Sequence, residues 1–175
     1  MVGRRHDKTG RSTGAMAPSR TAKLNKPPEG ESFAWFTSKL MRSPAFRAMS
    51  LNARKLVDRV QIEHMSQGGA SNGNLVVTYA DLVEWGIRRN SIAPAIAEVV
   101  ALGLLEHRPG RASHIAGRGH PQIFRISWLP TADEPPSTKW CAFETVEQAG
   151  KVAKTTRATG TDARHNAKRT PSAKI

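Results

Sequence analysis

The chain of 175 residues has almost no cysteine, since Cys141 is the only one. A single cysteine cannot form an intramolecular disulfide, and no Cys-x-x-Cys pair is present to bind zinc or carry out redox chemistry. We therefore expect an intracellular protein of a reducing compartment, with a cytoplasmic location.

Long hydrophobic runs are also missing. No segment approaches the roughly 18 consecutive apolar residues that a transmembrane helix requires. The first 20 residues carry positive charge, but no apolar stretch follows them, so they do not predict a secretory signal. We expect a soluble protein without a membrane partner.

Acidic residues are scarce: 14 stand against 27 lysines and arginines, which gives a formal charge of +13. The excess is spread along the chain, with 7 basic and 3 acidic residues in 1–31, 12 and 6 in 32–130, and 8 and 5 in 131–175. The middle segment is basic in its own right. Such a balance favours a polyanionic partner, with nucleic acid as the first candidate.

Composition divides the chain into three parts. Residues 1–31 consist mainly of Gly, Ser, Thr, Pro and basic residues, which bury too little to offset the entropy of ordering, so we expect a disordered basic arm. Residues 131–175 predict a linker, one short and weakly amphipathic helix around 145–157, and a basic tail. The folded domain is expected within 32–130.

Local signals predict helices in the first half of that domain. Short helices are predicted near 37–42 and 44–49. Ser50 can cap a longer helix of about four turns, in which apolar residues recur at three-and-four spacing. Thr78 and Asp81 fit the capping-box pattern, which predicts a helix over about 79–85.

A further helix is predicted between two glycines. Gly86 breaks the preceding helix and Gly103 closes the new one. Pro94 lacks an N–H and clashes with the carbonyl four residues earlier, so it fits only in a first turn. The regular helix should therefore start near Asn90 or Ser91.

Three short segments predict strands. Residues 75–77 are too brief for a helix, 104–108 directly follow Gly103, and 122–129 alternate apolar with polar residues. A glycine-rich loop joins the last two strands, which predicts a β-hairpin.

This order of elements resembles the winged helix-turn-helix family of DNA-binding domains. The resemblance covers Leu51 to Leu129 and is closest between Thr78 and Glu106. It implies an α+β, mainly α fold, in which a three-helix core is followed by a β-hairpin wing, with disordered basic tails on either side. Members of the family occur in bacterial transcription regulators and in plasmid or phage replication initiators.

In such a domain the start of the third helix enters the major groove of double-stranded DNA. Arginine can donate in a fork to guanine, asparagine can pair with adenine, and a serine or free N–H groups at a helix start suit phosphate. In the wing, arginines between glycines can reach phosphate or the minor groove. The candidate DNA-binding residues are Arg88, Arg89, Asn90, Ser91, Pro94, Arg108, Arg111 and Arg118.

The chain departs from the usual family pattern at this point. If the helix starts at Asn90, Arg88 and Arg89 lie in the turn and reach phosphate rather than bases. Base contacts by Ala93, Pro94 and Ala97 can only be apolar, for example with a thymine methyl group. The plainer alternative is that Asn90 or Ser91 simply caps the helix, that both arginines are solvated, and that the wing loop is a mobile, solvated loop.

Histidine and tryptophan raise two further questions. His107, His114 and His120 match no common zinc spacing, and weak phosphate contact explains them better than a metal site. His64 is expected at the edge of the core. Trp35, Trp85 and Trp128 are predicted as core anchors, whereas Trp140 lies outside the core and docks the C-terminal segment onto the domain or onto a partner.

No nucleophile-and-base arrangement, phosphate-binding glycine loop or pair of carboxylates indicates catalysis. We expect no enzyme activity, cofactor, metal or small-molecule substrate. The leading hypothesis is sequence-specific binding of double-stranded DNA in transcription regulation or replication initiation. A homodimeric regulator would bind half-sites about one helical turn apart.

Two alternatives remain open. One is a winged-helix protein-interaction module. The other is a non-specific nucleic-acid-binding protein that acts through its basic tails.

Overall fold

The computed structural model describes residues 29–110 and 121–169, with side chains up to residue 159 and without that of Pro109. Residues from Ala34 onward form one compact unit, which contains all of the described helices and strands. The predicted disordered arm lies outside the described residues except for its last three. No helix in the described part of the chain is long and apolar enough to cross a membrane.

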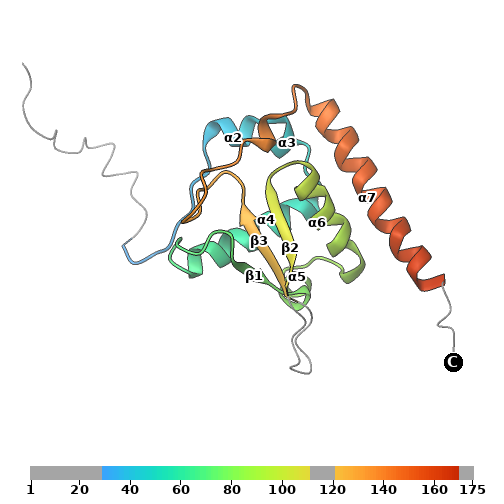
Figure 1. The fold of residues 1–175 in the computed structure, drawn as a ribbon, viewed down its shortest axis with the longest axis horizontal. Coiled ribbons are helices and arrows are strands. Elements are labelled where there is room, and N and C mark those ends of the chain that lie inside the picture. Colours follow the sequence, from blue (N-terminus) through green and yellow to red (C-terminus); the bar gives the residue numbers. More distant parts are fainter. Residues whose placement is uncertain (1–28, 111–120, 170–175) are drawn as a thin grey trace, which may run out of the picture. The chain divides into compact units, whose positions relative to one another are not determined.

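The protein has an α+β fold with three longer helices and a three-stranded antiparallel sheet (Figure 1). The α+β, mainly α class predicted from the sequence is confirmed at this level. In chain order the elements are α2 (Ser38–Arg42), α3 (Pro44–Arg47), α4 (Leu51–Ser66), β1 (Leu75–Val77), α5 (Tyr79–Glu84), the 3-10 turn η1 (Arg89–Ser91), α6 (Ile92–Ala101), β2 (Leu105–Pro109), β3 (Gln122–Ile126), the 3-10 turn η2 (Lys139–Cys141) and α7 (Val146–Arg169).

Helix α4 forms as its sequence predicts. Ser50 caps it by accepting a hydrogen bond from the Ala53 N–H, which satisfies one of the free donors of the first turn. The buried residues at three-and-four spacing include Leu56, Val60 and, at the last turn, His64. His64 is 8% exposed, so its predicted place at the edge of the core is confirmed.

Helix α5 has the predicted capping box. The Thr78 N–H donates to the Asp81 carboxylate, and the Thr78 hydroxyl oxygen accepts from the Asp81 N–H. The helix ends at Glu84, and Gly86, two residues later, has a φ of +82°. The N–H of Ile87 then returns to the carbonyl of Leu82 at 3.0 Å, which is the left-handed stop that glycine favours.

The sheet has the strand order β1-β3-β2. Strand β3 pairs with β1 through Leu75 and Phe124, and with β2 through Leu105 and Ile126. The hairpin of β2 and β3 is therefore present as predicted, but β3 ends at Ile126 instead of residue 129. Alternate residues of β3 are buried, so one face of the sheet covers the core.

The main core lies between this face of the sheet and helices α4, α5 and α6. A hydrophobic cluster joins them, and Met49, Tyr79, Trp128 and Leu129 pack at its margin. Its buried members are Ala53, Leu56, Val57, Val60, Leu75, Val77, Leu82, Ile87, Ile92, Ala95, Ile96, Val99, Leu105, Phe124 and Ile126.

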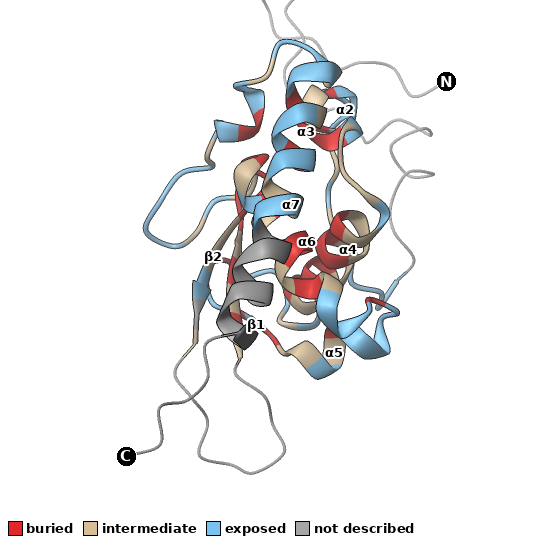
Figure 2. Ribbon diagram, turned by 90° about the vertical axis from the view of Figure 1, so that its right-hand side faces the viewer, coloured by how far each residue is buried: buried red, intermediate tan, exposed pale blue. Residues whose placement is uncertain are grey.

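A second core attaches the C-terminal segment to the domain. Helix α7 has 24 residues, so the prediction of a short helix around 145–157 is wrong in length. The helix packs against α6 and α3, and Figure 2 shows it running along α6. The buried residues of this cluster are Leu40, Ala45, Phe46, Leu102, Leu104, Trp140, Ala149 and Ala153.

Three predictions about tryptophan are corrected. Trp140 is only 7% exposed in the second core, so its predicted place outside the core is wrong, although it does dock the C-terminal segment onto the domain. Trp35 is 67% exposed and Trp85 is 42% exposed, so neither is a core anchor. Trp128 is partly buried between the two clusters and lies 5.8 Å from the Phe36 ring, as expected of an anchor.

Candidate nucleic-acid interface

The turn between α5 and α6 presents polar side chains from a fixed backbone. Ile87 is buried in the main core and holds the turn from inside. Lys55 of α4 donates to the Gly86 carbonyl at 3.0 Å and holds it from the side. The next two residues, Arg88 and Arg89, are exposed.

Both arginines carry positive charge that nearby carboxylates do not neutralise. Among the described residues neither Arg88 nor Arg89 forms an ion pair. The Arg89 guanidinium carbon lies 5.9 Å from the centre of the Tyr79 ring, which restricts its position without removing its charge. Two guanidinium groups therefore stand at the surface beside the start of α6.

Asn90 and Ser91 follow in the 3-10 turn η1, and regular α6 starts at Ile92. Asn90 is exposed and Ser91 partly exposed. The Ser91 hydroxyl lies 3.4 Å from the Asn90 side-chain oxygen and does not cap α6. The simple capping role that the sequence allowed for Ser91 is therefore not adopted.

Pro94 does not belong to this surface. It lies in the first turn of α6, as its missing N–H requires, but its side chain is buried. A buried proline offers almost no surface for the apolar contact with DNA that the sequence predicted. The partly exposed Ala93 and Ala97 remain on the outer side of the helix.

The hairpin lies at the same end of the domain as α5 and the start of α6 (Figure 1). The Gly110 N–H donates to the Pro121 carbonyl at 2.9 Å, which brings the two ends of the loop together. Arg108 is exposed on β2 and donates to the Gly73 carbonyl at 3.2 Å. The other predicted wing residues, Arg111 and Arg118, lie outside the described residues.

A buried carboxylate that the sequence analysis did not single out connects three helices. Glu98 of α6 has no exposed surface. It accepts from the N–H and the hydroxyl of Ser50, both at 2.7 Å, and pairs with Arg157 of α7 at 2.8 Å. An acidic residue in an otherwise apolar helix was the available signal, because a buried charge must be paired.

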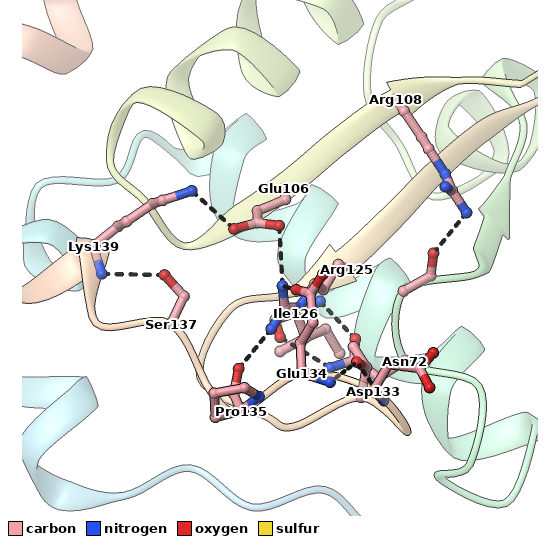
Figure 3. Close-up of polar contacts among 12 residues, drawn as sticks. Asn72, Glu106, Arg108, Arg125, Ile126, Asp133, Glu134, Pro135, Ser137 and Lys139 are labelled. Carbon is pink, nitrogen blue, oxygen red and sulfur yellow. Dashed lines mark hydrogen bonds and ion pairs between the residues drawn. The ribbon is translucent and has the colours of Figure 1, made fainter.

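A second polar network holds the segment after β3 against the hairpin (Figure 3). Arg125 of β3 pairs with Glu106 of β2 and with Glu134, and it donates to the Pro135 carbonyl. Lys139 pairs with Glu106 at 3.0 Å. This hydrogen bond, with the nearby positive charges, lowers the pKa of Glu106 below its ordinary value.

The Asn72 side chain forms a third polar network. Its side-chain nitrogen donates to the carbonyls of Ile126, Leu129 and Pro130, and its oxygen accepts from the Ile126 N–H at 2.7 Å. The asparagine thus fixes the end of β3 beside the loop that precedes β1. Its place in a Gly- and Asn-rich loop predicted only a turn.

An open cleft of about 490 Å³ lies over this side of the hairpin, and Asn72, Glu106, Arg125 and Glu134 line part of it. These polar groups already bond to one another or to the backbone, so the cleft does not indicate a ligand. His107 lies 2.7 Å from the Gln122 side-chain oxygen. Within the described residues no group of three His, Cys, Asp or Glu side chains is arranged to hold a metal, and His114 and His120 lie outside them.

Comparison with protein-family models, with curated proteins and with solved structures finds no significant match. The functional argument therefore depends on the geometry and charge of this chain.

Proposed function

We propose that the chain is a sequence-specific double-stranded DNA-binding protein with a winged helix-turn-helix domain, acting in transcription regulation or replication initiation. The observation that carries this proposal is topological. The order α4-β1-α5-α6-β2-β3, with β1 paired to β3, is the arrangement of a three-helix core followed by a wing. In this assignment α6 is the recognition helix and the β2–β3 hairpin is the wing.

Charge and exposure at one end of the domain support the same proposal. Arg88, Arg89 and Asn90 are exposed at the start of α6. Guanidinium groups in this position can neutralise phosphates on either side of a groove that admits the helix. No membrane or small-molecule partner enters the proposal.

The test is binding of duplex DNA at several salt concentrations by the full chain and by Arg88→Ala/Arg89→Ala. Each engaged arginine should contribute about 0.9 to the slope of log affinity against log salt. We expect the double variant to bind more weakly and its slope to flatten by up to about 1.8. A variant with Arg111→Ala/Arg118→Ala tests the wing in the same way.

The matched control is Arg42→Ala/Arg47→Ala, which removes two exposed charges from α2 and α3. These helices lie at the other end of the domain from α5 (Figure 1). If both pairs of substitutions change affinity and slope equally, binding follows net charge and the proposed face is wrong.

A protein-interaction module is the second candidate, and the exposed apolar side chains favour it. Val83 and Trp85 near the end of α5 are 45% and 42% exposed, and Val100 of α6 is 41% exposed. If the full chain and all the variants show no binding of duplex DNA, this second function replaces the first; if all bind equally, the basic tails carry the binding.

A further inference from the structure

Helix α7 covers a side of α6 that the main core does not use. The residues that α6 contributes to the main core are Ile92, Ala95, Ile96 and Val99. At about 100° of rotation per residue, Pro94 and Glu98 lie about 130° round the helix from the centre of that core side. Both are nevertheless buried, and Glu98 pairs there with Arg157 of α7 at 2.8 Å. The outward side of α6 is therefore partly covered by another helix (Figure 2).

The two helices run in opposite directions, and Figure 1 shows α7 starting near α3 and running beside α6. Ala149, near the start of α7, shares a hydrophobic cluster with Leu102, just after the end of α6. Two turns later in α7, Arg157 meets Glu98, which lies four residues before Leu102. Helix α7 then continues for twelve residues to Arg169, about 18 Å, whereas six residues, about 9 Å, separate Glu98 from the start of α6. Helix α7 is therefore long enough to extend beyond the start of α6.

The major groove of B-DNA has room for only one helix. It is about 12 Å wide, and an α-helix with its side chains is about 10–12 Å across. Two packed helices have axes about 8–10 Å apart, so α6 and α7 together span roughly 20 Å. A groove that admits α6 alone does not admit the pair.

Resting on the proposed function, we infer that α7 is an autoinhibitory element, which covers the recognition helix α6 and has to move away before DNA binds. DNA then selects the arrangement of the chain in which α6 is open. The apparent affinity equals the affinity of the open arrangement multiplied by the fraction of molecules that adopt it. A substitution that loosens α7 should therefore strengthen DNA binding.

The contacts of α7 suit a reversible attachment. Among the α7 side chains that the structure describes, only the small Ala149 and Ala153 are buried, so each contributes little apolar surface. When Arg157 leaves, Glu98 keeps both hydrogen bonds from Ser50, so the buried carboxylate retains partners. The released guanidinium can bind a phosphate, which makes DNA a competitor of Glu98 for Arg157.

The first test is Arg157→Met in the full chain, with duplexes selected from a randomised library by the unmodified chain and by the variant. Loss of one positive charge by itself weakens binding to DNA. Loss of the ion pair acts in the opposite direction. While the open arrangement is the minor one, we expect about fivefold to thirtyfold tighter binding of a selected duplex.

Lys154→Met is the matched control for the charge. It removes one positive charge from an exposed position of the same helix, three residues earlier. Because no contact between α7 and α6 is lost, this variant should bind the selected duplex slightly more weakly than the unmodified chain.

Ala153→Gln loosens α7 without a change in charge. Ala153 is 1% exposed, so a longer side chain does not fit while α7 stays in place, and we expect tighter binding. Thr155→Gln introduces the same side chain at an exposed position and should leave the affinity unchanged. Hydrogen exchange at the amides of α4 checks that the domain stays folded in each variant.

Hydrogen exchange of the unmodified chain tests the inference without any substitution. If DNA binds only after α7 has moved away, the amides of α7 should exchange faster in the complex with a selected duplex than in the free chain. The amides of α4 should not exchange faster in the complex.

Three results would overturn the inference. If the unmodified chain binds a duplex and neither Arg157→Met nor Ala153→Gln binds it more tightly, α7 does not restrict α6, while DNA binding stands. If the amides of α7 exchange more slowly in the complex, the helix stays in place and contacts the DNA itself. If neither the unmodified chain nor either variant enriches any duplex, the proposed function fails together with the inference.

Discussion

A single glycine decides whether the C-terminal segment can pack against the end of α6. Gly103 has a φ of +70°, which L-residues with a side chain rarely adopt. A Cβ atom built at this position would lie 2.7 Å from the carbonyl carbon of Lys139 and 2.8 Å from the nitrogen of Trp140. Because η2 passes this close, both the backbone angle and the space require glycine.

Gly103→Ala should therefore be among the most destabilising single substitutions in the domain. The left-handed backbone costs about 1–2 kcal/mol for a residue with a Cβ atom, and forcing apart two packed segments adds about 1–3 kcal/mol. We expect the free energy of unfolding, measured in urea, to fall by about 2–5 kcal/mol.

Gly68→Ala is the matched control for the backbone angle alone. Gly68 has a φ of +65°, and nothing lies within 4 Å of a Cβ atom built there. Its substitution should cost only the conformational part, about 1–2 kcal/mol. Equal losses for the two variants would show that close packing against η2 contributes nothing.

At the scale of helices and strands, the correct predictions concern helix starts and helix ends, which depend on residues close to one another in the sequence. Caps at Ser43, Ser50 and Thr78 hydrogen-bond to residues three positions away, and Gly86 and Gly103 stop helices by their own backbone angles. Such interactions are contained in a few neighbouring residues. The order of helices and strands could therefore be predicted from the α2 region to β3.

Long-range packing could not be predicted in the same way. The sequence around Trp140 suggests docking, but it does not show that the ring packs with Leu102 and Leu104, about 40 residues earlier in the chain. The burial of Pro94 likewise depends on the neighbours of α6 and not on its own sequence. Trp35 and Trp85 stand among apolar neighbours in the sequence, yet the fold leaves both exposed. For the candidate site, the exposed turn and the apolar character of the following helix could both be predicted, but the buried pairing of Glu98 with Ser50 and Arg157 could not.

The attachment of α7 is the element-scale feature with the clearest test. Among the described residues, Arg157 is the only one that forms an ion pair with the buried Glu98. Arg157→Met keeps the aliphatic stem but leaves the carboxylate with Ser50 alone. Because Arg157 is partly exposed, the loss should be below that of a fully buried pair, about 1–2 kcal/mol in the free energy of unfolding.

Hydrogen exchange at the amides of α7 distinguishes detachment of the helix from global unfolding. In Arg157→Met we expect faster exchange in α7 than in α4. Lys154→Met, which changes an exposed lysine three residues earlier on the same helix, is the control and should leave both rates unchanged. Unchanged exchange in both variants would show that Glu98 does not hold α7.

On the scale of the whole molecule, positive charge is divided between the domain and its flanks. Inside the domain, Arg59, Arg125, Lys139 and Arg157 are engaged in ion pairs, whereas Arg88 and Arg89 form none among the described residues. Residues 1–31 add seven basic and three acidic groups. The domain and the N-terminal segment therefore offer two separate sources of attraction for a polyanion.

Deletion of residues 1–31 separates these two sources. Charges that act on phosphates attract every duplex equally, so their loss should weaken binding to selected and scrambled duplexes by the same factor. The ratio of the two affinities should stay constant if base contacts come from the folded domain, as the proposed function requires. Titrations of both duplexes at two salt concentrations measure the ratio and the slope.

A deletion at the C-terminal end should leave α7 complete, and this helix extends to Arg169. Removing residues 170–175 leaves the helix intact and serves as the companion truncation, whereas a cut after Arg157 would shorten the helix itself. If the chain that lacks residues 1–31 and 170–175 binds selected and scrambled duplexes equally, the flanks supply the discrimination between duplexes. In that case α6 and the turn before it do not read the DNA sequence. If the ratio persists while the slope flattens, the folded domain reads the bases and the flanks add only non-specific attraction.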